Sequence, residues 1–254
     1  MTQQGKWADP SLEFLGQAEG PAPSRLGDVM LERLTQAIVE GHFKPGDALP
    51  SEGQLASAYK VSKPVAREAL RELAAMGVVQ VQQGKVSRVR ALDGIPLQRF
   101  YRLAIGAGQR GLVEAVELRR ILEVPIARMA AENRTPADLT VLEELLDRME
   151  RSRGNVAAWI EVDTAFHLHL AHMTKNRLLV LQMHGLQQLI HQMMVRFNDY
   201  QAKKGRNWDE TLARHRRIAK AVIAGRGPSA ARAMEDHFAA ADRAVEAIYG
   251  DGGS

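Results

Sequence analysis

The chain has 254 residues, 45% of them hydrophobic, and a formal net charge of +4, so it is long enough for a small domain plus another of ordinary size. Cysteine is absent, which excludes disulfides and thiolate metal sites and is compatible with a reducing cytoplasm. No apolar run approaches a membrane span, and the N-terminus lacks the charged start and apolar core of a signal peptide, so we expect a soluble cytoplasmic protein.

The first elements in chain order are an arm and a helix. Residues 1–24 contain Gly, Pro and Gln with little periodicity, so we expect a flexible N-terminal arm. Residues 26–40 have the apolar spacing of an amphipathic helix, and Gly41 is placed to end it. The inward face of this helix is predicted to hold Val29, Met30, Leu34, Ala37 and Ile38.

Two short helices joined by a tight turn are predicted next. Ser51 can cap the first helix, with Gln54 as the reciprocal half of a capping box. Ser62 is the predicted N-cap of the second helix, with Pro64 in its first turn. This arrangement is typical of a helix-turn-helix. The residues of the second helix that we expect to face inward are Val65, Ala69, Leu70 and Leu73.

The outward face of that second helix is basic. Lys63, Arg67 and Arg71 recur at every fourth residue, which suits a groove lined by phosphates. Residues 78–90 then alternate apolar and polar side chains around Gly84 and predict a two-stranded wing. Residues 55–92 hold seven Lys or Arg against two Glu, so the basic charge is local, as a DNA-binding surface requires. The alternative is a small helical domain with a solvated charged face.

The ordered set LPSE, LA, VS-K, REAL, G and GK between residues 49 and 85 resembles the winged helix-turn-helix of the GntR family of bacterial transcription regulators. The resemblance implies base and phosphate contacts from the recognition helix and a wing tip that enters the minor groove. Two positions depart from the family pattern, because Gly53 replaces a frequent cation and Ala66 replaces a valine. The predicted DNA contacts are Ser51, Ser62, Lys63, Arg67, Arg71, Gln83, Gly84 and Lys85.

A second domain follows the wing. Residues 92–96 break the pattern with Asp, Gly and Pro, so we place a DNA-binding domain at residues 25–93 and a second domain at residues 94–250, before a short tail at 251–254. Residues 97–249 have helical periodicity with breaks that imply about seven helices. The predicted class is therefore mainly α: a winged helix-turn-helix followed by an all-α bundle.

Four polar residues of this bundle occupy apolar helix faces. Asp163 and His167 are four residues apart on one predicted helix, and His215 and His237 each lie on the apolar stripe of a later helix. A single histidine in such a place is more often a hydrogen-bonded core residue than a ligand. Burial of all four is costly unless they find partners, and one shared cation would satisfy them together.

The same four residues, with the segment VELRRILEVPIARMAAE at 116–132, resemble the FCD effector domain of FadR-type GntR regulators. The resemblance implies a metal held by Asp163, His167, His215 and His237, a set that suits Zn²⁺ or Ni²⁺ best. It also places Arg119 where the family commonly has an arginine facing the effector pocket, and a guanidinium grips a carboxylate bidentately. The alternative for Arg119 is an exposed cation paired with Glu123.

We therefore expect a transcription regulator, not an enzyme. It would repress as a homodimer on a near-palindromic DNA operator, under the control of a small carboxylate effector bound at or near the metal. One alternative is a regulator for which the metal itself is the signal. A metal-dependent hydrolase fused to a DNA-binding head is another, but the sequence places no general base beside the four residues, since Glu161 points elsewhere on its helix.

Overall fold

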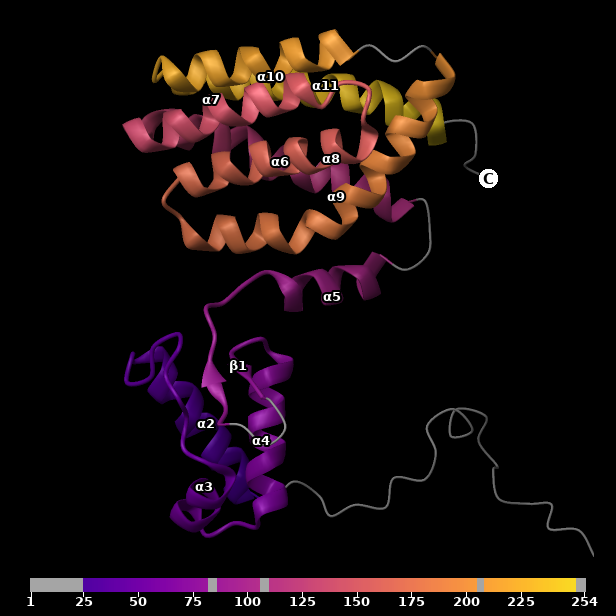
Figure 1. Ribbon diagram of the computed structural model, residues 1–254. Coiled ribbons are helices and arrows are strands. Elements are labelled where there is room, and N and C mark those ends of the chain that lie inside the picture. The colour runs from indigo at the N-terminus through magenta and orange to yellow at the C-terminus, as the bar shows by residue number, and fades with distance from the viewer. Residues whose placement is uncertain (1–24, 82–85, 106–109, 205–207, 250–254) are drawn as a thin grey trace, which may run out of the picture. The chain divides into compact units, whose positions relative to one another are not determined.

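The computed structural model describes residues 25–81, 86–105, 110–204 and 208–249 (Figure 1). The chain divides into two compact units, residues 1–91 and 92–254, and each is described by itself. The predicted class, mainly α with a small wing, is confirmed. The predicted arm, the tip of the wing and the tail lie outside the described residues. The elements of the first unit are α2 (Arg25–Val39), α3 (Glu52–Tyr59), α4 (Lys63–Ala75), β1 (Val79–Gln80) and β2 (Arg88–Val89).

The predicted cap at the start of α3 is confirmed. The Ser51 hydroxyl accepts from the backbone N–H of Gln54 at 3.3 Å, and the Gln54 side chain accepts from the backbone N–H of Ser51 at 2.8 Å. The helix ends at Lys60, which has the left-handed φ of 55°. Ser62 precedes α4 as predicted, with Pro64 in the first turn, but its hydroxyl makes no capping hydrogen bond.

The inward face of α4 differs by one position from the prediction. Ala66 is fully buried, whereas Val65 is only half-buried. Residue 66 precedes Ala69, Leu70 and Leu73 by three, four and seven residues, the spacing of one helix face, whereas Val65 lies one position off that face. α2 and α3 pack against this face. The prediction that Val29 of α2 faces inward is wrong, because its side chain is 49% exposed, whereas Met30 and Leu34 are buried. The core of the unit also includes Leu49, Leu55, Val79 and Val89.

The wing is a two-stranded antiparallel sheet. Val79 pairs with Val89 and Gln80 pairs with Arg88, so both valines point into the core of the unit. An isolated bridge between Ala48 and Arg88 ties the segment before α3 to the second strand. The strand pairing fixes the base of the wing. The predicted contacts Gln83, Gly84 and Lys85 at its tip lie outside the described residues.

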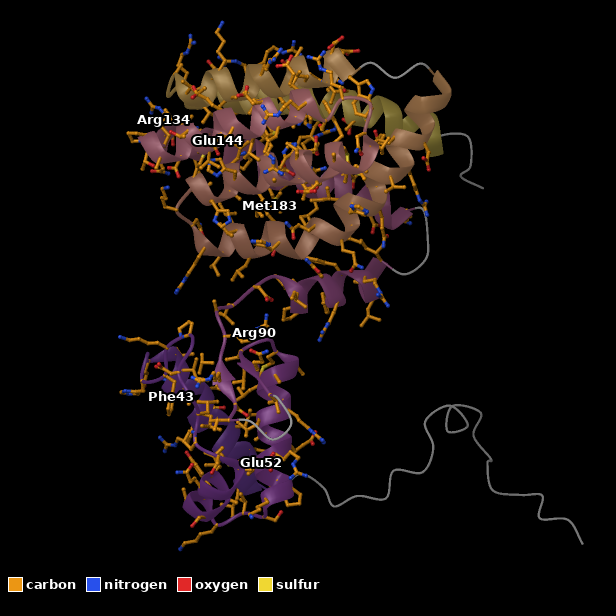
Figure 2. The ribbon with its side chains drawn as sticks, in the orientation of Figure 1. Phe43, Glu52, Arg90, Arg134, Glu144 and Met183 are labelled. Atoms are coloured by element: carbon orange, nitrogen blue, oxygen red, sulfur yellow. The ribbon has the colours of Figure 1, made fainter. Side chains whose placement is uncertain are left out.

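The second unit contains seven helices in its described part. α6 lies at the centre of the bundle and packs against α8, α9, α10 and α11, while α7 packs against α8 and α10. The core of the bundle includes Phe166, Leu170, Met183 (labelled in Figure 2) and Phe238. The helices are α5 (Ile95–Ile105), α6 (Arg110–Asn133), α7 (Pro136–Arg151), α8 (Val156–Met173), α9 (Arg177–Lys204), α10 (Trp208–Ile223) and α11 (Gly227–Tyr249).

Two glycines bring α5 and α9 into close contact. A Cβ atom at Gly185 of α9 would lie 2.7 Å from Cβ of Leu97, so only glycine permits this approach. A Cβ atom at Gly94, just before α5, would collide with the backbone of Gly185. The side-chain amide of Gln98 also donates to the His184 carbonyl at 2.9 Å. The two helices therefore touch nearly backbone to backbone.

Asp138 ties the start of α7 to the turn between α8 and α9. Its carboxylate accepts from the backbone N–H of Thr135 at 2.9 Å and from Nζ of Lys175 at 2.7 Å. Burial alone would raise the pKa of Asp138, but the hydrogen bonds from Lys175 and Thr135 outweigh it and lower the pKa. A lowered pKa in the folded state stabilises the protein above the ordinary carboxyl pKa, and this contribution is lost as the pH falls through the lowered value.

We expect Asp138→Ala to lower the free energy of unfolding by about 1–2 kcal/mol at neutral pH, because it removes a helix cap and a partly buried ion pair. The loss should shrink as the pH falls below about 4, where the carboxyl protonates in the unfolded chain while it stays ionised in the folded protein to a lower pH. Urea unfolding of both proteins across this pH range measures the effect. An equal loss at low and neutral pH would assign it to packing instead of charge.

Candidate DNA interface and ligand site

The exposed face of α4 presents the predicted cations. Lys63, Arg67 and Arg71 are exposed, as is Ser62 before the helix. Arg67 is held by Glu52 at the start of α3, which is labelled in Figure 2: its Nε lies 3.0 and 3.1 Å from the two carboxylate oxygens, and its Nη2 lies 2.9 Å from one of them. Arg71 lies 3.6 Å from Glu68. The recognition helix thus carries one arginine oriented by short contacts with a carboxylate, and a second arginine whose contact with a carboxylate is longer.

The two departures from the family pattern have different structural settings. A Cβ atom at Gly53 would meet only Cε of Lys63, at 3.7 Å, so the position has room for the cation that it lacks. Ala66 is fully buried against the core, so its small size concerns packing and not DNA contact. The Ser51 hydroxyl is engaged in the α3 cap, although the residue is exposed.

The four predicted ligand residues lie together in the second unit. Asp163 and His167 come from α8, His215 from α10 and His237 from α11. One ring nitrogen from each histidine lies within 4.8 Å of the others. Nε2 of His215 is 3.0 Å from Oδ1 of Asp163, and Nε2 of His167 is 4.0 Å from Oδ2. The packing of α8, α10 and α11 therefore brings one carboxylate and three imidazoles together.

The donor atoms of this cluster fit a metal ion. His215 Nδ1 lies 2.9 Å from the Thr211 carbonyl, which leaves Nε2 to face the cluster. Nε2 of His167, Nε2 of His215 and Nδ1 of His237 are buried, and none makes a hydrogen bond within the described part of the chain. Buried polar atoms without partners are costly, and a shared cation satisfies all of them at once. The residues present therefore fit a divalent metal.

The electrostatics of the cluster keep Asp163 and His237 in the forms that bind metals. Burial alone would raise the pKa of Asp163, but His215, His167 and His237 outweigh it and hold the pKa well below its usual range. Burial lowers the pKa of His237 well below its usual value, and the neighbouring His215 and His167 lower it further. An ionised carboxylate beside a neutral imidazole is the protonation state that a divalent metal requires.

Arg119 is paired with Glu123, but the pair is buried and not exposed as the alternative interpretation required. Nε of Arg119 donates to Oε1 of Glu123 at 2.6 Å, and the two side chains are 4% and 1% exposed. Burial alone would raise the pKa of Glu123, but Arg119 and His167 outweigh it and lower the pKa. Nη2 of Arg119 is buried and makes no hydrogen bond in the described part of the protein.

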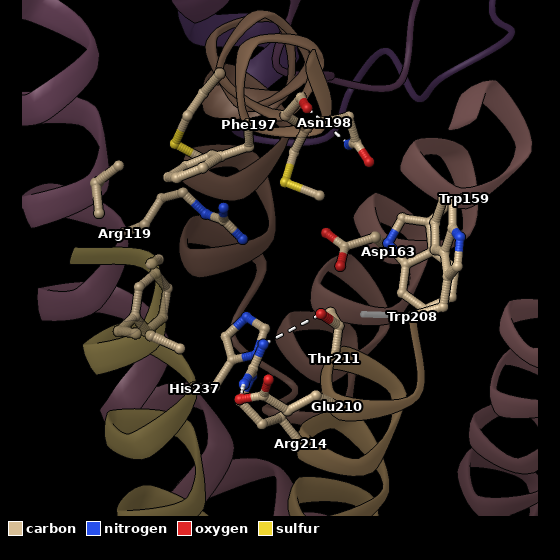
Figure 3. Close-up of a pocket in the computed structure, with 16 residues that line it drawn as sticks. Arg119, Trp159, Asp163, Phe197, Asn198, Trp208, Glu210, Thr211, Arg214 and His237 are labelled. Carbon is tan, nitrogen blue, oxygen red and sulfur yellow. Dashed lines mark hydrogen bonds and ion pairs between the residues drawn. The ribbon is translucent and has the colours of Figure 1, made fainter. Parts of the chain in front are cut away.

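A cavity of about 140 Å³ lies over the cluster. Figure 3 shows Arg119, Asp163 and His237 pointing into the same space, with Trp159 and Trp208 packed together on one side. The rings of these tryptophans are 4.7 Å apart, and the Arg119 guanidinium lies 5.3 Å from the ring centre of Phe238. The remaining lining includes Val116, Met193, Met194, Phe197, Asn198 and Arg214. The cavity therefore joins one buried arginine, the metal cluster and an apolar wall.

The comparisons with known proteins match both units. Residues 27–89 match the family described as bacterial regulatory proteins, gntR family, and residues 114–240 match the FCD domain. The HTH-type transcriptional regulator LutR of Bacillus subtilis (strain 168) is 32% identical over 202 residues, which are 79% of this chain and 92% of LutR. The chain belongs to the GntR family.

Other members of the GntR family extend this result. The Glc operon transcriptional activator of Escherichia coli (strain K12) is 28% identical over 83% of this chain and 85% of its own length. The HTH-type transcriptional repressor NanR of Klebsiella aerogenes is 31% identical over 66% of this chain and 67% of its own length. The solved structure titled Streptococcus agalactiae GntR covers 85% of this chain and 99% of its own, with 26% identity and a TM-score of 0.69.

Membership of the GntR family with an FCD domain makes the protein a DNA-binding transcription regulator, and it is not an enzyme. The hydrolase alternative is therefore set aside. No helix among the described residues is long and apolar enough to cross a membrane.

Several residues at the site were not predicted from the sequence. The spacing of Glu123 predicts only a surface partner for Arg119, and the spacing of Asn198 does not distinguish it from surface residues. Nothing in the sequence marks Trp159, Trp208 and Phe197 as site residues, because their joint position depends on how α8, α9 and α10 pack. The remaining histidines make other contacts: Nε2 of His169 lies 2.8 Å from the Asp138 carbonyl, and the rings of His172 and His184 are 6.0 Å apart.

Lys63→Ala is expected to weaken binding to all duplexes alike, because an exposed cation at this position suits a phosphate and not a base. The slope of log K against log salt should become shallower by about one unit, since one fewer counterion is released. Fluorescence anisotropy over a salt series measures both effects. Lys220→Ala on α10, an exposed cation of the other unit, is the control, and equal slopes in all three proteins would exclude a phosphate contact.

Proposed function

We propose that this regulator represses transcription as a homodimer on a near-palindromic operator and is controlled by a small carboxylate effector, bound at or near a divalent metal in its C-terminal helical domain. The observation that carries the proposal is the cavity into which Arg119, whose Nη2 has no hydrogen bond among the described residues, points together with Asp163 and His237 of the cluster. Asp163, His167, His215 and His237 would hold the metal, and an ion that takes five or six ligands would leave positions open for an oxygen ligand.

The charges around the cavity favour an anionic effector. Among the described residues, Arg119 contributes one positive charge, Glu123 and Asp163 contribute two negative charges, and Arg214 is neutralised by Glu210 at 2.5 Å. A divalent metal makes this group positive by one charge. A single carboxylate then restores neutrality, and buried charges are tolerated only when they are balanced in this way.

The size and lining of the cavity restrict the range of candidate effectors further. Its volume of about 140 Å³ is close to that of cavities that hold one benzene molecule. A short organic acid fits this space, whereas a long acyl chain exceeds it. The apolar wall of Trp159, Trp208 and Phe197 suits a compact carbon skeleton more than a polyol.

Zn²⁺ or Ni²⁺ suits the proposed metal site best, because three imidazoles and one carboxylate form a borderline nitrogen and oxygen donor set. The dimer follows from the way that a winged helix-turn-helix reads two half-sites related by two-fold symmetry. Repression is the proposed sign of regulation, since repressors named NanR are 31–32% identical to this chain over their matched segments. The Glc operon relative is named an activator, so the sign is also an outcome of the experiment.

The experiment combines metal analysis with operator binding. Operators are first selected from a random duplex library by the purified protein, and fluorescence anisotropy is then followed with and without Zn²⁺ or Ni²⁺ and a panel of short carboxylates. Release of the operator by one carboxylate in the metal-loaded protein supports the proposal. Response to metal alone would make the ion the signal, and unchanged operator affinity under all conditions would overturn effector control.

Arg119→Lys is the matched variant for this experiment, because it keeps the positive charge beside Glu123 and loses the planar fork that grips a carboxylate. We expect it to retain metal and operator binding while its response to the carboxylate weakens by about tenfold or more. Arg128→Lys, an exposed arginine paired with Glu132 on the same helix, is the control. Equal responses of the two variants would remove Arg119 from the effector site.

A further inference from the structure

Glu123 lies between the two halves of the proposed site. One of its oxygens, Oε1, accepts from Nε of Arg119 at 2.6 Å. Its other oxygen, Oε2, is in contact with Nδ1 of His167. Glu123 can contact both residues because Arg119 lies one turn away on α6, and α6 packs against α8, which carries His167. One buried carboxylate therefore touches the candidate effector residue and a candidate metal ligand.

The contact with His167 favours one of its two ring tautomers, because a carboxylate oxygen lies next to Nδ1. A carboxylate accepts hydrogen bonds and does not donate them, so it favours the His167 tautomer that carries its proton on Nδ1. Nε2 then has no proton and faces Asp163 at 4.0 Å, toward the cluster. The Thr211 carbonyl does the same for His215, whose Nδ1 it accepts from at 2.9 Å. Two histidines of the cluster are thus oriented from outside it.

The contact with Arg119 fixes the other half of the site. With Nε held by Glu123, the Arg119 side chain has few alternative rotamers, and its Nη2 remains free to face the cavity. The other ion pairs at this spacing on α6, Arg110 with Glu114 and Arg128 with Glu132, have side chains 47–91% exposed and touch no histidine of the cluster. Glu123 differs from them in its burial and in its second partner.

We propose that Glu123 is a positioning residue that holds Arg119 toward the effector and His167 toward the metal at the same time. The inference rests on the proposed function, because it assigns a role to a residue of that same site. It follows that anything that disturbs Glu123 changes both metal affinity and the response to a carboxylate. Loss of such an orienting partner typically lowers metal affinity by about 10- to 100-fold.

The test compares the full-length wild-type protein with Glu123→Gln, which keeps the size of the side chain and removes its charge. Zn²⁺ affinity is measured by competition with a chelator, and we expect a loss of about 10- to 100-fold in the variant. Glu132→Gln, from the exposed pair on the same helix, is the control and should bind Zn²⁺ like the wild type. Equal Zn²⁺ affinity in Glu123→Gln and the wild type would overturn the inference.

A spectroscopic readout separates positioning from a general loss of folding. Nitrogen-15 NMR of histidine-labelled protein, with His167 identified through a His167→Asn variant, reports which ring nitrogen carries the proton. We expect a protonated Nδ1 in wild-type protein, both metal-free and Zn²⁺-loaded, and a smaller Nδ1-protonated fraction in metal-free Glu123→Gln. The wild-type spectrum is informative even if the variant does not fold, because a bare Nδ1 and a protonated Nε2 in wild type overturn the inference.

The outcomes also separate this inference from the proposed function. A wild-type protein that binds Zn²⁺ and responds to a carboxylate, beside a Glu123→Gln variant with the same affinity and the same tautomer, leaves the proposed function standing and removes Glu123 from it. A wild-type protein that binds neither Zn²⁺ nor Ni²⁺ overturns the metal site and, with it, the role of Glu123.

Discussion

His215→Ala should reduce the metal content of the purified protein from about one ion per chain to nearly none. His215 is fully buried, and its Nε2 is the ring nitrogen closest to Asp163, at 3.0 Å. Without the imidazole, Asp163 remains buried and loses its nearest partner. We expect a loss of stability of about 3 kcal/mol or more, seen as a lower melting temperature. Elemental analysis and thermal melts give both results.

The control for this variant is His191→Ala, which removes an exposed histidine of α9 that is not part of the cluster. It should leave metal content and melting temperature unchanged. Both variants should still bind a duplex at low salt, because the cations of α4 belong to the other compact unit. Full metal occupancy in His215→Ala would show that the four-residue site is misassigned.

Arg67→Ala is expected to weaken operator binding by about 1–3 kcal/mol, or roughly 5- to 150-fold, if the guanidinium reads a base edge. Two effects add in this variant. The recognition helix loses a fixed arginine, and the Glu52 carboxylate that held it through three short contacts becomes an unpaired negative charge near the phosphates. Competition with non-operator duplexes should show a reduced specificity ratio as well as a reduced affinity.

The control for Arg67→Ala is Arg33→Ala, because Arg33 is an exposed cation on α2 and not on the recognition helix. This variant should lose little operator affinity and keep its specificity ratio. If both variants lose affinity equally and neither changes the ratio, Arg67 acts only through its charge. The double variant Arg67→Ala/Glu52→Gln then measures how much of the loss comes from the unpaired carboxylate.

Local patterns were enough to predict the elements of both units. The cap of α3 depends only on Ser51 and Gln54, which are three residues apart, and the structure contains both of its hydrogen bonds. Asp163 and His167 share a face of α8 because of their spacing alone. The error at Val65 and Ala66 has a local cause too, since both residues are apolar and only the spacing of i, i+3, i+4 and i+7 selects Ala66 over the larger Val65.

The contacts between helices could not be predicted in this way. The spacing of Arg119 and Glu123 is the same whether the pair is exposed or buried, and only the packing of α6 against α8 puts Glu123 beside His167. The cavity wall depends on the same kind of information, because Trp159 and Trp208 come from α8 and α10 and meet only in the folded bundle. Sequence periodicity shows which face of a helix is buried, but it does not show which neighbour covers that face.

Helix α9 connects the cavity to α5, because it lines the cavity at one point and packs closely against α5 at another. The helix has 28 residues, contacts α5 at Gly185 and lines the cavity at Met193 and Phe197, about 12–18 Å further along its axis. Side chains usually absorb small displacements by changing rotamer, but a backbone contact through glycine has no rotamer to change. Under the proposed effector control, a tilt of α9 at the cavity would therefore be passed on to α5, which follows the DNA-binding unit in the chain.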